Sequence, residues 1–458
     1  MGQKLLVIQQ KNISIHIIGL GVAEENNQTY LSTAAQQALY NCPIVVGSKR
    51  QQQLIAHYLR PKQDLFNYPS PFSQLSQLFS DFNLLLQQYP QHHIALLASG
   101  DPLFYSIGTW ISQHFQPDQY CFYPNISSIQ VAFARIKQAW QTATIISLHG
   151  RALVSLRPQL RNRGWYALLT DQYSQPPQIA AELIQQGFGQ SKLWICAALG
   201  TEEESVQAFD CQSLSQTTKT FHPLHVTLVY TQGKAHYLPS FAGIEDRHFE
   251  TGRLAGKGMI TKKQIRLAAL SLLQTQHNDI AWDVGAGCGG MAVEWAYWHL
   301  HSQLYAIESH PERLNYLEIN RQKFGVVKNL QIVTGTAPQA LDSLPNPDKV
   351  FIGGSNGAML DILACCWHSL NNTGCIVISC VTEECQYEVR QFINAINKNA
   401  VQNDLEPQTM MQVEQLSLAV SHAENLANKT VMRPQLAVQL IKISKNLPAI
   451  NPKTEIMA

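Results

Sequence analysis

Short runs of β-branched and aliphatic residues alternate with amphipathic stretches along most of this chain, and this alternation constrains its fold more than any other feature. The first runs read ISIHIIG, PIVVGS, HIALLASG and TATIISLHG and lie within residues 13–150. Strands of about five residues separated by helices predict a parallel-rich sheet that is covered by helices. Residues 193–231 contain more strand and less helix, so this α/β unit is expected to finish in antiparallel strands.

A second β/α series follows residues 243–261, which we call the connecting segment. This segment is rich in glycine and charge and has no apolar period. The later runs DIAWDVGAG, QLYAIE, NLQIVTG, DKVFIGG and GCIVISCV predict a doubly wound domain. Thr261, which precedes KKQIRLAALSLL, is expected to cap an amphipathic helix.

The chain length of 458 residues is enough for two or three domains at about 100–200 residues each. We therefore predict two α/β domains, residues 1–240 and 241–445, followed by a loose tail over residues 446–458. The boundary falls near the connecting segment because no apolar periodicity crosses it.

Composition excludes several classes of protein. The 33 Lys and Arg residues balance 32 Asp and Glu residues, so broad binding to nucleic acid is not expected. No stretch is long and apolar enough for a membrane span, and the start of the chain does not resemble a signal peptide. The ten cysteines are scattered without a C-x-x-C or a His partner, which predicts a cytoplasmic protein without a metal site.

The sequence from Asp283 to Gly290, DVGAGCGG, follows a predicted strand and opens a helix, where doubly wound folds bind adenosine cofactors. Its glycines also satisfy G-x-G-x-x-G, so a dinucleotide remains an alternative. Asp283 would repel a pyrophosphate but could face a cationic ligand such as S-adenosylmethionine. Glu308 ends the next strand, where a carboxylate can accept hydrogen bonds from both ribose hydroxyls.

Several motifs carry a resemblance to corrin-forming enzymes. The second half contains TKKQIR from Thr261, the loop 282–290, Glu294 and VFIGG from Val350. The first half contains IGLG, VGSKR, SGDPLFY, PNISSIQ with FAR, and SLHGR. The first half resembles the tetrapyrrole methylase family. Both halves in this order resemble the fused precorrin-6Y C(5,15)-methyltransferase (decarboxylating) family of the vitamin B12 pathway, over about residues 13–445.

The resemblance implies one S-adenosylmethionine site in each domain, for methylation of carbon 5 in the first and carbon 15 with decarboxylation in the second. In the first domain it points to Leu20, Gly21, Ser99, Gly100, Asp101, Phe104, Ser127, Ser128, Ile129 and Thr170. In the second domain it points to Thr261, Gly285, Ala286, Gly287, Cys288, Gly289, Glu308, Thr336 and Ala337.

The implied substrate is a tetrapyrrole with many acetate and propionate groups, so its pocket needs local positive charge. Six cations crowd the connecting segment and the helix after it: Arg247, Arg253, Lys257, Lys262, Lys263 and Arg266. Arg253 and Lys257, among glycines, are expected to touch substrate. His149 is the candidate general acid or base in the first domain. The macrocycle can act as its own electron sink, so no further cofactor is expected.

Two other functions stay open on the sequence. The glycine pattern also suits a nicotinamide-dependent oxidoreductase, although Asp283 disfavours it. A non-catalytic S-adenosylmethionine sensor is also possible, but it would need only one donor loop. The resemblance further implies self-association into a homo-oligomer.

Overall fold

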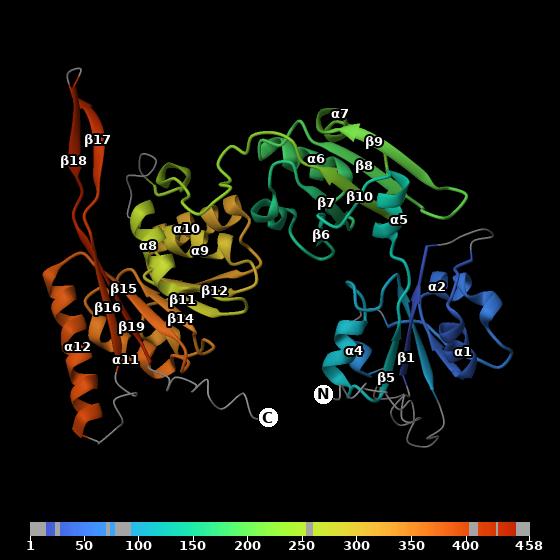
Figure 1. The fold of residues 1–458 in the computed structure, drawn as a ribbon, viewed down its shortest axis with the longest axis horizontal. Helices are drawn as coiled ribbons and strands as arrows, with labels where there is room; N and C mark the ends of the chain where they lie inside the picture. The colour runs from blue at the N-terminus through green and yellow to red at the C-terminus, as the bar shows by residue number, and fades with distance from the viewer. Residues whose placement is uncertain are drawn as a thin grey trace, which may run out of the picture. The chain divides into compact units, whose positions relative to one another are not determined.

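The computed structural model describes residues 15–22, 28–69, 74–77, 93–252, 260–402, 411–426 and 429–445, with the side chains of 399–402 excepted. The chain divides into two compact units (Figure 1). The first contains residues up to Arg151 and Asn162–Lys234. The second contains Ala152–Arg161 and residues from Ala235 onward, so a short piece of the N-terminal half packs with the C-terminal half.

The first sheet of unit one is wholly parallel, with strand order β3-β2-β4-β1-β5. Its strands are β1 (Ile15–Leu20), β2 (Ile44–Val46), β3 (Asp64–Phe66), β4 (Ile94–Ser99) and β5 (Tyr120–Tyr123). Its helical elements are α1 (Thr33–Asn41), α2 (Lys49–Leu54), η3 (Ala56–Tyr58) and α4 (Gly108–His114). Parallel strands place their carboxyl ends at one edge, which brings the residues after β1 and β4 together.

The second sheet of unit one has the order β6-β7-β10-β8-β9, and only β6 and β7 are parallel among its pairs. Its strands are β6 (Thr144–Ser147), β7 (Trp165–Leu169), β8 (Lys192–Ala197), β9 (Ser205–Asp210) and β10 (His225–Tyr230). Its helices are α5 (Ser128–Arg135), α6 (Pro176–Gln185) and α7 (Cys211–Ser215). The prediction that this α/β unit finishes in antiparallel strands is confirmed.

Unit two is built on a seven-stranded sheet with the order β13-β12-β11-β14-β15-β19-β16. Its first five strands are parallel: β11 (Ile280–Val284), β12 (Gln303–Glu308), β13 (Leu330–Thr334), β14 (Lys349–Ile352) and β15 (Cys375–Cys380). The remaining two, β16 (Gln412–Leu418) and β19 (Val438–Ser444), are antiparallel. The doubly wound prediction is confirmed.

The helices of unit two cover both faces of this sheet. They are α8 (Lys263–Leu273), α9 (Gly290–Trp298), α10 (Pro311–Phe324), α11 (Met359–Ser369) and α12 (Glu383–Gln402), with short helices η5 (Leu153–Gln159), η6 (Asp246–His248) and η7 (Gln339–Leu341). The face that carries Val284, Ile307 and Ile352 forms a core with α11 and α12. Alternation along β11 then directs Asp283 to the opposite face, towards α9.

A two-stranded ribbon, β17 (Ser421–Leu426) and β18 (Lys429–Pro434), extends from the end of β16 (Figure 1). Every described residue of β17 is exposed, and β18 buries little more. A lone hairpin of this kind buries too little apolar surface to be stable by itself. Among the described residues, no helix has the length and apolarity needed to cross a membrane. The predicted tail, 446–458, lies outside the described residues.

The expectation that Thr261 caps the first helix of unit two is wrong. Helix α8 begins at Lys263, and its N-cap residue, Lys262, makes no side-chain capping bond. The first amide of the helix, that of Lys263, donates instead to Asp246 Oδ1 at 3.0 Å. A carboxylate distant in sequence therefore replaces the local cap that the sequence suggests.

Candidate active sites

The glycine loop after β11 follows a path that side chains would obstruct. Gly285, Gly287 and Gly289 all have positive φ, at 73°, 59° and 85°. A Cβ atom on Gly285 would lie 2.6 Å from the carbonyl oxygen of Gly354, which follows β14. The amides of Gly285 and Ala286 both donate to Ile307 O at 3.0 Å, so the loop is fixed to the end of β12. Glycine is required here for both conformation and space.

Glu308, the last residue of β12, is the buried acceptor at this edge of the sheet, with 5% of its surface exposed. Its Oε2 accepts the Gly287 N–H at 2.8 Å. Its Oε1 accepts the N–H groups of Ser309 and His310, each at 2.8 Å. A carboxylate held by three amides keeps a fixed orientation and retains lone pairs for a further donor.

A cavity of about 870 Å³ opens at these strand ends. Seven residues that the sequence predicted for the second donor site line it: Thr261, Gly285, Ala286, Gly287, Glu308, Thr336 and Ala337. They come from the connecting segment and from the ends of β11, β12 and β13. The structure therefore brings together side chains and backbone that lie up to 76 residues apart in the chain (337 − 261).

Asp283 does not line the cavity, contrary to the direct contact with a cationic ligand that the sequence suggested. It is 1% exposed, and neither carboxylate oxygen has a well-aligned hydrogen-bond partner among the described residues. Burial raises the pKa of Asp283 to about 7; the amide of Ala292 opposes this shift, and the nearby charge of Glu308 adds to it. The residue can act on a ligand through its charge state, but not by direct contact.

Cys288 and Gly289 also lie outside the cavity lining. Cys288 is buried, and its carbonyl accepts from Asn320 Nδ2 at 2.8 Å. Gly289 is the N-cap of α9, where a Cβ would lie 2.2 Å from Leu317 Cδ1. Both residues therefore help to fix the path of the loop without lining the cavity.

The cations around the connecting segment have different surroundings. Arg253 and Lys257, predicted to touch substrate, lie outside the described residues. Lys262 lines the cavity. Arg266 was expected to contribute charge for the substrate, but its side chain is completely buried in ion pairs with Asp246 and Glu294. A guanidinium without exposed surface cannot bind a substrate carboxylate.

In unit one the ends of β1 and β4 are in close contact. The amide of Gly100 donates to Leu20 O at 2.6 Å, and a Cβ on Gly100 would lie 3.0 Å from Ser127 Cα. The hydroxyl of Ser99 accepts from Gln51 Nε2 at 3.3 Å. Four residues predicted for the first donor site therefore meet at one edge of the sheet, although Leu20 is 2% exposed and its side chain belongs to the core.

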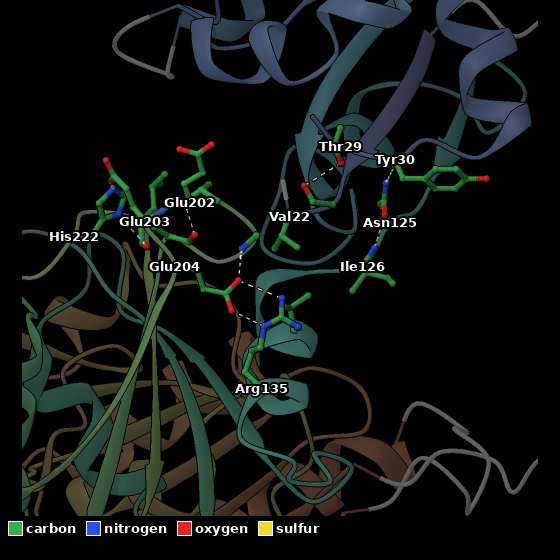
Figure 2. A pocket seen from close by; sticks show the side chains of 16 residues that line it. Val22, Thr29, Tyr30, Asn125, Ile126, Arg135, Glu202, Glu203, Glu204 and His222 are labelled. Atoms are coloured by element: carbon green, nitrogen blue, oxygen red, sulfur yellow. Dashed lines mark hydrogen bonds and ion pairs between the residues drawn. The ribbon is translucent and has the colours of Figure 1, made fainter. Parts of the chain in front are cut away.

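A cavity of about 1380 Å³ lies beside this edge (Figure 2). Gly21 lines it, and a Cβ there would lie 2.8 Å from Asn125 Oδ1. Asn125 Nδ2 donates to Gly19 O at 3.1 Å and to Tyr30 O at 2.8 Å, which holds the loop after β1. On the other wall Arg135 Nε donates to Glu204 Oε1 at 2.5 Å (Figure 2).

The other predicted residues of unit one do not line this cavity. Asp101 Oδ1 accepts the Leu103 N–H at 2.8 Å and so closes a turn. Phe104 is 37% exposed and precedes α4. Ser127 caps α5, Ser128 begins it, and Ile129 packs in the core.

The two predicted residues at the second sheet of unit one also lie outside this cavity. Thr170 Oγ1 lies 2.9 Å from His225 Nε2. His149 is exposed on the loop after β6.

Sequence reasoning missed several lining residues. Asn125 and Arg135 lie inside the motifs PNISSIQ and FAR, so their polar side chains within these motifs were an available signal. Arg313, Asn356, Gln435 and Leu436 line the cavity of unit two without such a signal. Arg313 lies in the first turn of α10, Asn356 in the loop after β14, and Gln435 and Leu436 between β18 and β19.

Comparison with known proteins identifies the family. The tetrapyrrole (corrin/porphyrin) methylases match residues 14–214, and the precorrin methyltransferase domain matches residues 253–445. A precorrin-6Y C(5,15)-methyltransferase (decarboxylating) from Sinorhizobium sp is 32% identical over 375 residues, which cover 80% of this chain and 84% of that protein. A protein of the same name from Mycobacterium tuberculosis is 28% identical over 379 residues, covering 81% of this chain and 88% of that protein.

A probable cobalt-precorrin-6B C(15)-methyltransferase (decarboxylating) from Methanothermobacter thermautotrophicus is 32% identical over 133 residues, covering 29% of this chain and 68% of that protein. The chain therefore matches relatives named for both methylations and a relative named for carbon-15 methylation alone. The fold and the glycine loops agree with the family that the match over 80% of the chain indicates. This chain belongs to the precorrin-6Y C(5,15)-methyltransferase (decarboxylating) family.

Proposed function

We propose that this chain methylates carbons 5 and 15 of a precorrin tetrapyrrole and releases one acetate carboxyl as carbon dioxide, in the biosynthesis of cobalamin. The match over 80% of the chain to a decarboxylating C(5,15)-methyltransferase supports both activities. Unit one, which contains most of the residues that match the tetrapyrrole methylases, would act at carbon 5. Unit two would act at carbon 15 and carry the decarboxylation.

The observation that carries this proposal is the carboxylate of Glu308, which three amides hold beside the glycine-rich loop. S-adenosylmethionine supplies an electrophilic methyl group on a sulfonium and contains no phosphate. Glu308 would accept the ribose hydroxyls, and the backbone of Gly285–Gly287 would lie against the methionine part. Glu308 could accept the ribose hydroxyls of a dinucleotide equally well. The feature that disfavours a dinucleotide is Asp283, the buried carboxyl two positions before the first glycine of the loop, whose charge would repel a diphosphate there. The loop after β1, where Gly21 lines the cavity of unit one, supports a second donor there, so one donor per unit is expected.

The protein contributes mainly alignment and desolvation to the transfer. An electron-rich ring carbon attacks the methyl carbon in line, the carbon–sulfur bond breaks, and its electron pair stays on sulfur. No protein nucleophile takes part in this step. In the decarboxylation, the electron pair of the broken carbon–carbon bond passes into the conjugated ring, and a proton replaces the carboxyl. His149, Arg253 and Lys257 remain the candidates for proton handling and substrate contact.

Positive charge in unit two suits the carboxylate arms of such a substrate. Lys262, the N-cap residue of α8, and Arg313, on α10, both line the cavity of about 870 Å³. Arg313 keeps 39% of its side chain exposed, with Nη1 4.0 Å from Glu308 Oε2. A guanidinium with free donors can bind a carboxylate through two hydrogen bonds.

The decisive experiment combines the protein with a precorrin-6 type tetrapyrrole and isotopically labelled S-adenosylmethionine and reads the product by mass. Two labelled methyl groups and the loss of one carbon dioxide are expected. Calorimetric titration with S-adenosylhomocysteine should give a stoichiometry near two per chain. A single site, or binding of a nicotinamide dinucleotide instead, would contradict the proposal.

Two further expectations concern the state of the protein in the cell. Self-association is supported by the exposed ribbon, on which Leu426 and Met432 are 56% and 64% exposed. Light scattering of the wild-type chain and of Met432→Ser should show whether the ribbon mediates it. A cytoplasmic location is supported by the ten cysteines, which form no disulfide bond among the described residues.

A further inference from the structure

Unit two contains a charged pair that is completely removed from solvent. Arg266, on α8, and Glu294, on α9, both have 0% side-chain exposure, and Arg266 Nε donates to Glu294 Oε2 at 2.7 Å. The guanidinium also lies 4.9 Å from the centre of the Phe249 ring. Neither charge belongs to the lining of the cavity.

The remaining hydrogen bonds of this pair go to the connecting segment and to its two ends. Glu294 Oε1 accepts the amides of Gly243 at 2.6 Å and Ile244 at 3.0 Å. Arg266 Nη1 donates to the carbonyl of Thr261 and to Asp246 Oδ1, each at 2.6 Å. Arg266 Nη2 donates to the carbonyl of Ile244. One ion pair thus binds two stretches of backbone that are distant in sequence, residues 243–246 and Thr261.

Stability alone does not account for such a pair. Burying two charges costs several kcal/mol of desolvation, and a well-packed apolar pair often serves a core equally well. Apolar side chains could not bind the two amides and two carbonyls that converge here. The planar guanidinium, with five donors in a fixed fork, provides the geometry that a lysine lacks.

The held backbone continues directly into the wall of the cavity. Ile260, Thr261 and Lys262 line it. Ile260 rests on the start of α9, where a Cβ on Gly290 would lie 2.5 Å from Ile260 Cγ1. Glu294 lies one helical turn after Gly290 on the same helix, so α9 fixes both the glycine loop and the segment that faces it.

We infer that Arg266 and Glu294 are positioning residues for the second methyl-transfer site: they fix Ile260–Lys262 as one wall of the donor cavity. This inference rests on the proposed function, since it concerns the donor that unit two binds. The pair acts through Thr261 and its neighbours and touches no ligand itself.

The test uses Glu294→Gln in the full chain. The glutamine keeps the shape but only one acceptor, so its NH₂ group must face either Arg266 Nε or the amides of Gly243 and Ile244. In both orientations the link between Arg266 and the backbone of 243–244 through residue 294 is broken. Titration with S-adenosylhomocysteine should show one site weakened by about tenfold or more and the other unchanged. The KM for S-adenosylmethionine in carbon-15 methylation should rise at least as much, while kcat at saturation changes by less than about threefold. Carbon-5 methylation should be unchanged.

Glu318→Gln is the matched control, because Glu318 pairs with Arg321 at 2.7 Å on α10 of the same unit but is 43% exposed. It should leave both donor sites as they are. Equal binding by folded Glu294→Gln and wild type would overturn the inference. A fall in kcat without a change in KM would overturn it too.

If Glu294→Gln does not fold, Asp246→Ala decides the question. Asp246 is 21% exposed and lies at the edge of this group of hydrogen bonds. Its loss therefore leaves the Arg266–Glu294 pair intact but removes the bond between Arg266 and residue 246. Binding at one site should weaken about threefold to tenfold with an intact unfolding transition, and unchanged binding would overturn the inference. Failure of the proposed function is distinguishable, because wild type would then lack one of the two donor sites.

Discussion

Glu308 accepts a hydrogen bond from the backbone of Gly287 at 2.8 Å, so the ends of two neighbouring strands are tied together through the loop that would cradle a ligand. This carboxylate therefore has two tasks. It orders the glycine loop and, in the proposed function, recognises the ribose. Substitutions can separate these tasks.

Glu308→Ala should weaken S-adenosylhomocysteine binding at one of two sites by about thirtyfold, or roughly 2 kcal/mol, because three amides and the ligand lose an acceptor. Glu308→Gln should be milder, since one acceptor and the shape remain. Calorimetric titration measures both. The site in unit one is the internal control, and equal effects of the two substitutions would contradict the dual role.

Asp283 should make the stability of unit two depend on pH. Burial raises its pKa from 3.8 to about 7, so its contribution is full below pH 3.8 and is lost as the pH rises through 7. The unfolding temperature of unit two should fall between about pH 4 and 7, as followed by calorimetry. Asp283→Asn should remove most of this slope. An unchanged slope would show that other groups govern it.

His16 should give unit one the opposite dependence. Burial, and to a smaller extent the charge of neighbouring His93, 3.2 Å away, lower its pKa from 6.5 to about 4. Its contribution is present above pH 6.5 and is lost as the pH falls through 4. His16→Gln should flatten the acid branch of the unfolding curve for unit one. The unfolding of unit two at the same pH values is the control.

Asp101 tests the function of the first donor loop. Its Oδ1 accepts the Leu103 amide at 2.8 Å, a bond that asparagine can keep. Asp101→Asn should preserve the turn, so a loss of carbon-5 methylation in this variant would show that the charge matters. Asp101→Ala should abolish carbon-5 methylation while sparing carbon 15. Loss of both activities in a folded variant would mean that the residue is misassigned.

Arg157 should stabilise unit two although it lies in the N-terminal half of the sequence. It is 8% exposed, and its Nη1 donates to Gln322 O at 2.9 Å and Lys323 O at 3.1 Å, at the end of α10. Arg157→Met should destabilise unit two by about 1–3 kcal/mol, because two helix-end carbonyls lose their donor. Thermal unfolding measures this. Arg390→Met, at an exposed position on α12, should have little effect.

The site of unit two could be predicted well because its signals are local. Glycines at a strand end and an acid at the next strand end follow from the topology of a parallel sheet. Thr261 as a helix cap was wrong, because the competing partner, Asp246, lies in an irregular stretch that periodicity does not describe. The burial of Arg266 could not be predicted either, because its partner Glu294 lies 28 residues away, on another helix.

Unit one was predicted less completely. Motif resemblance located the loops after β1 and β4, but side chains such as Asp101 and Ser127 bind their own turns rather than the cavity. The cavity wall formed by Arg135 and Glu204 depends on a contact between α5 and the loop after β8, 69 residues apart. A contact between residues so far apart leaves no repeating pattern in a single sequence, so it could not be predicted from one.

The approach of Gly285 to Gly354, where a Cβ would lie 2.6 Å from a carbonyl oxygen, has a consequence for how this sequence can vary. Because the obstructing atom is backbone, no side-chain change at position 354 could make room for a larger residue at 285. The two loops lie 69 positions apart in the sequence, and a change in the backbone path of one therefore requires a matching change in the other. Genetic exchange that replaced one loop with that of a distant methyltransferase would break the fit even if every ligand-binding residue were kept.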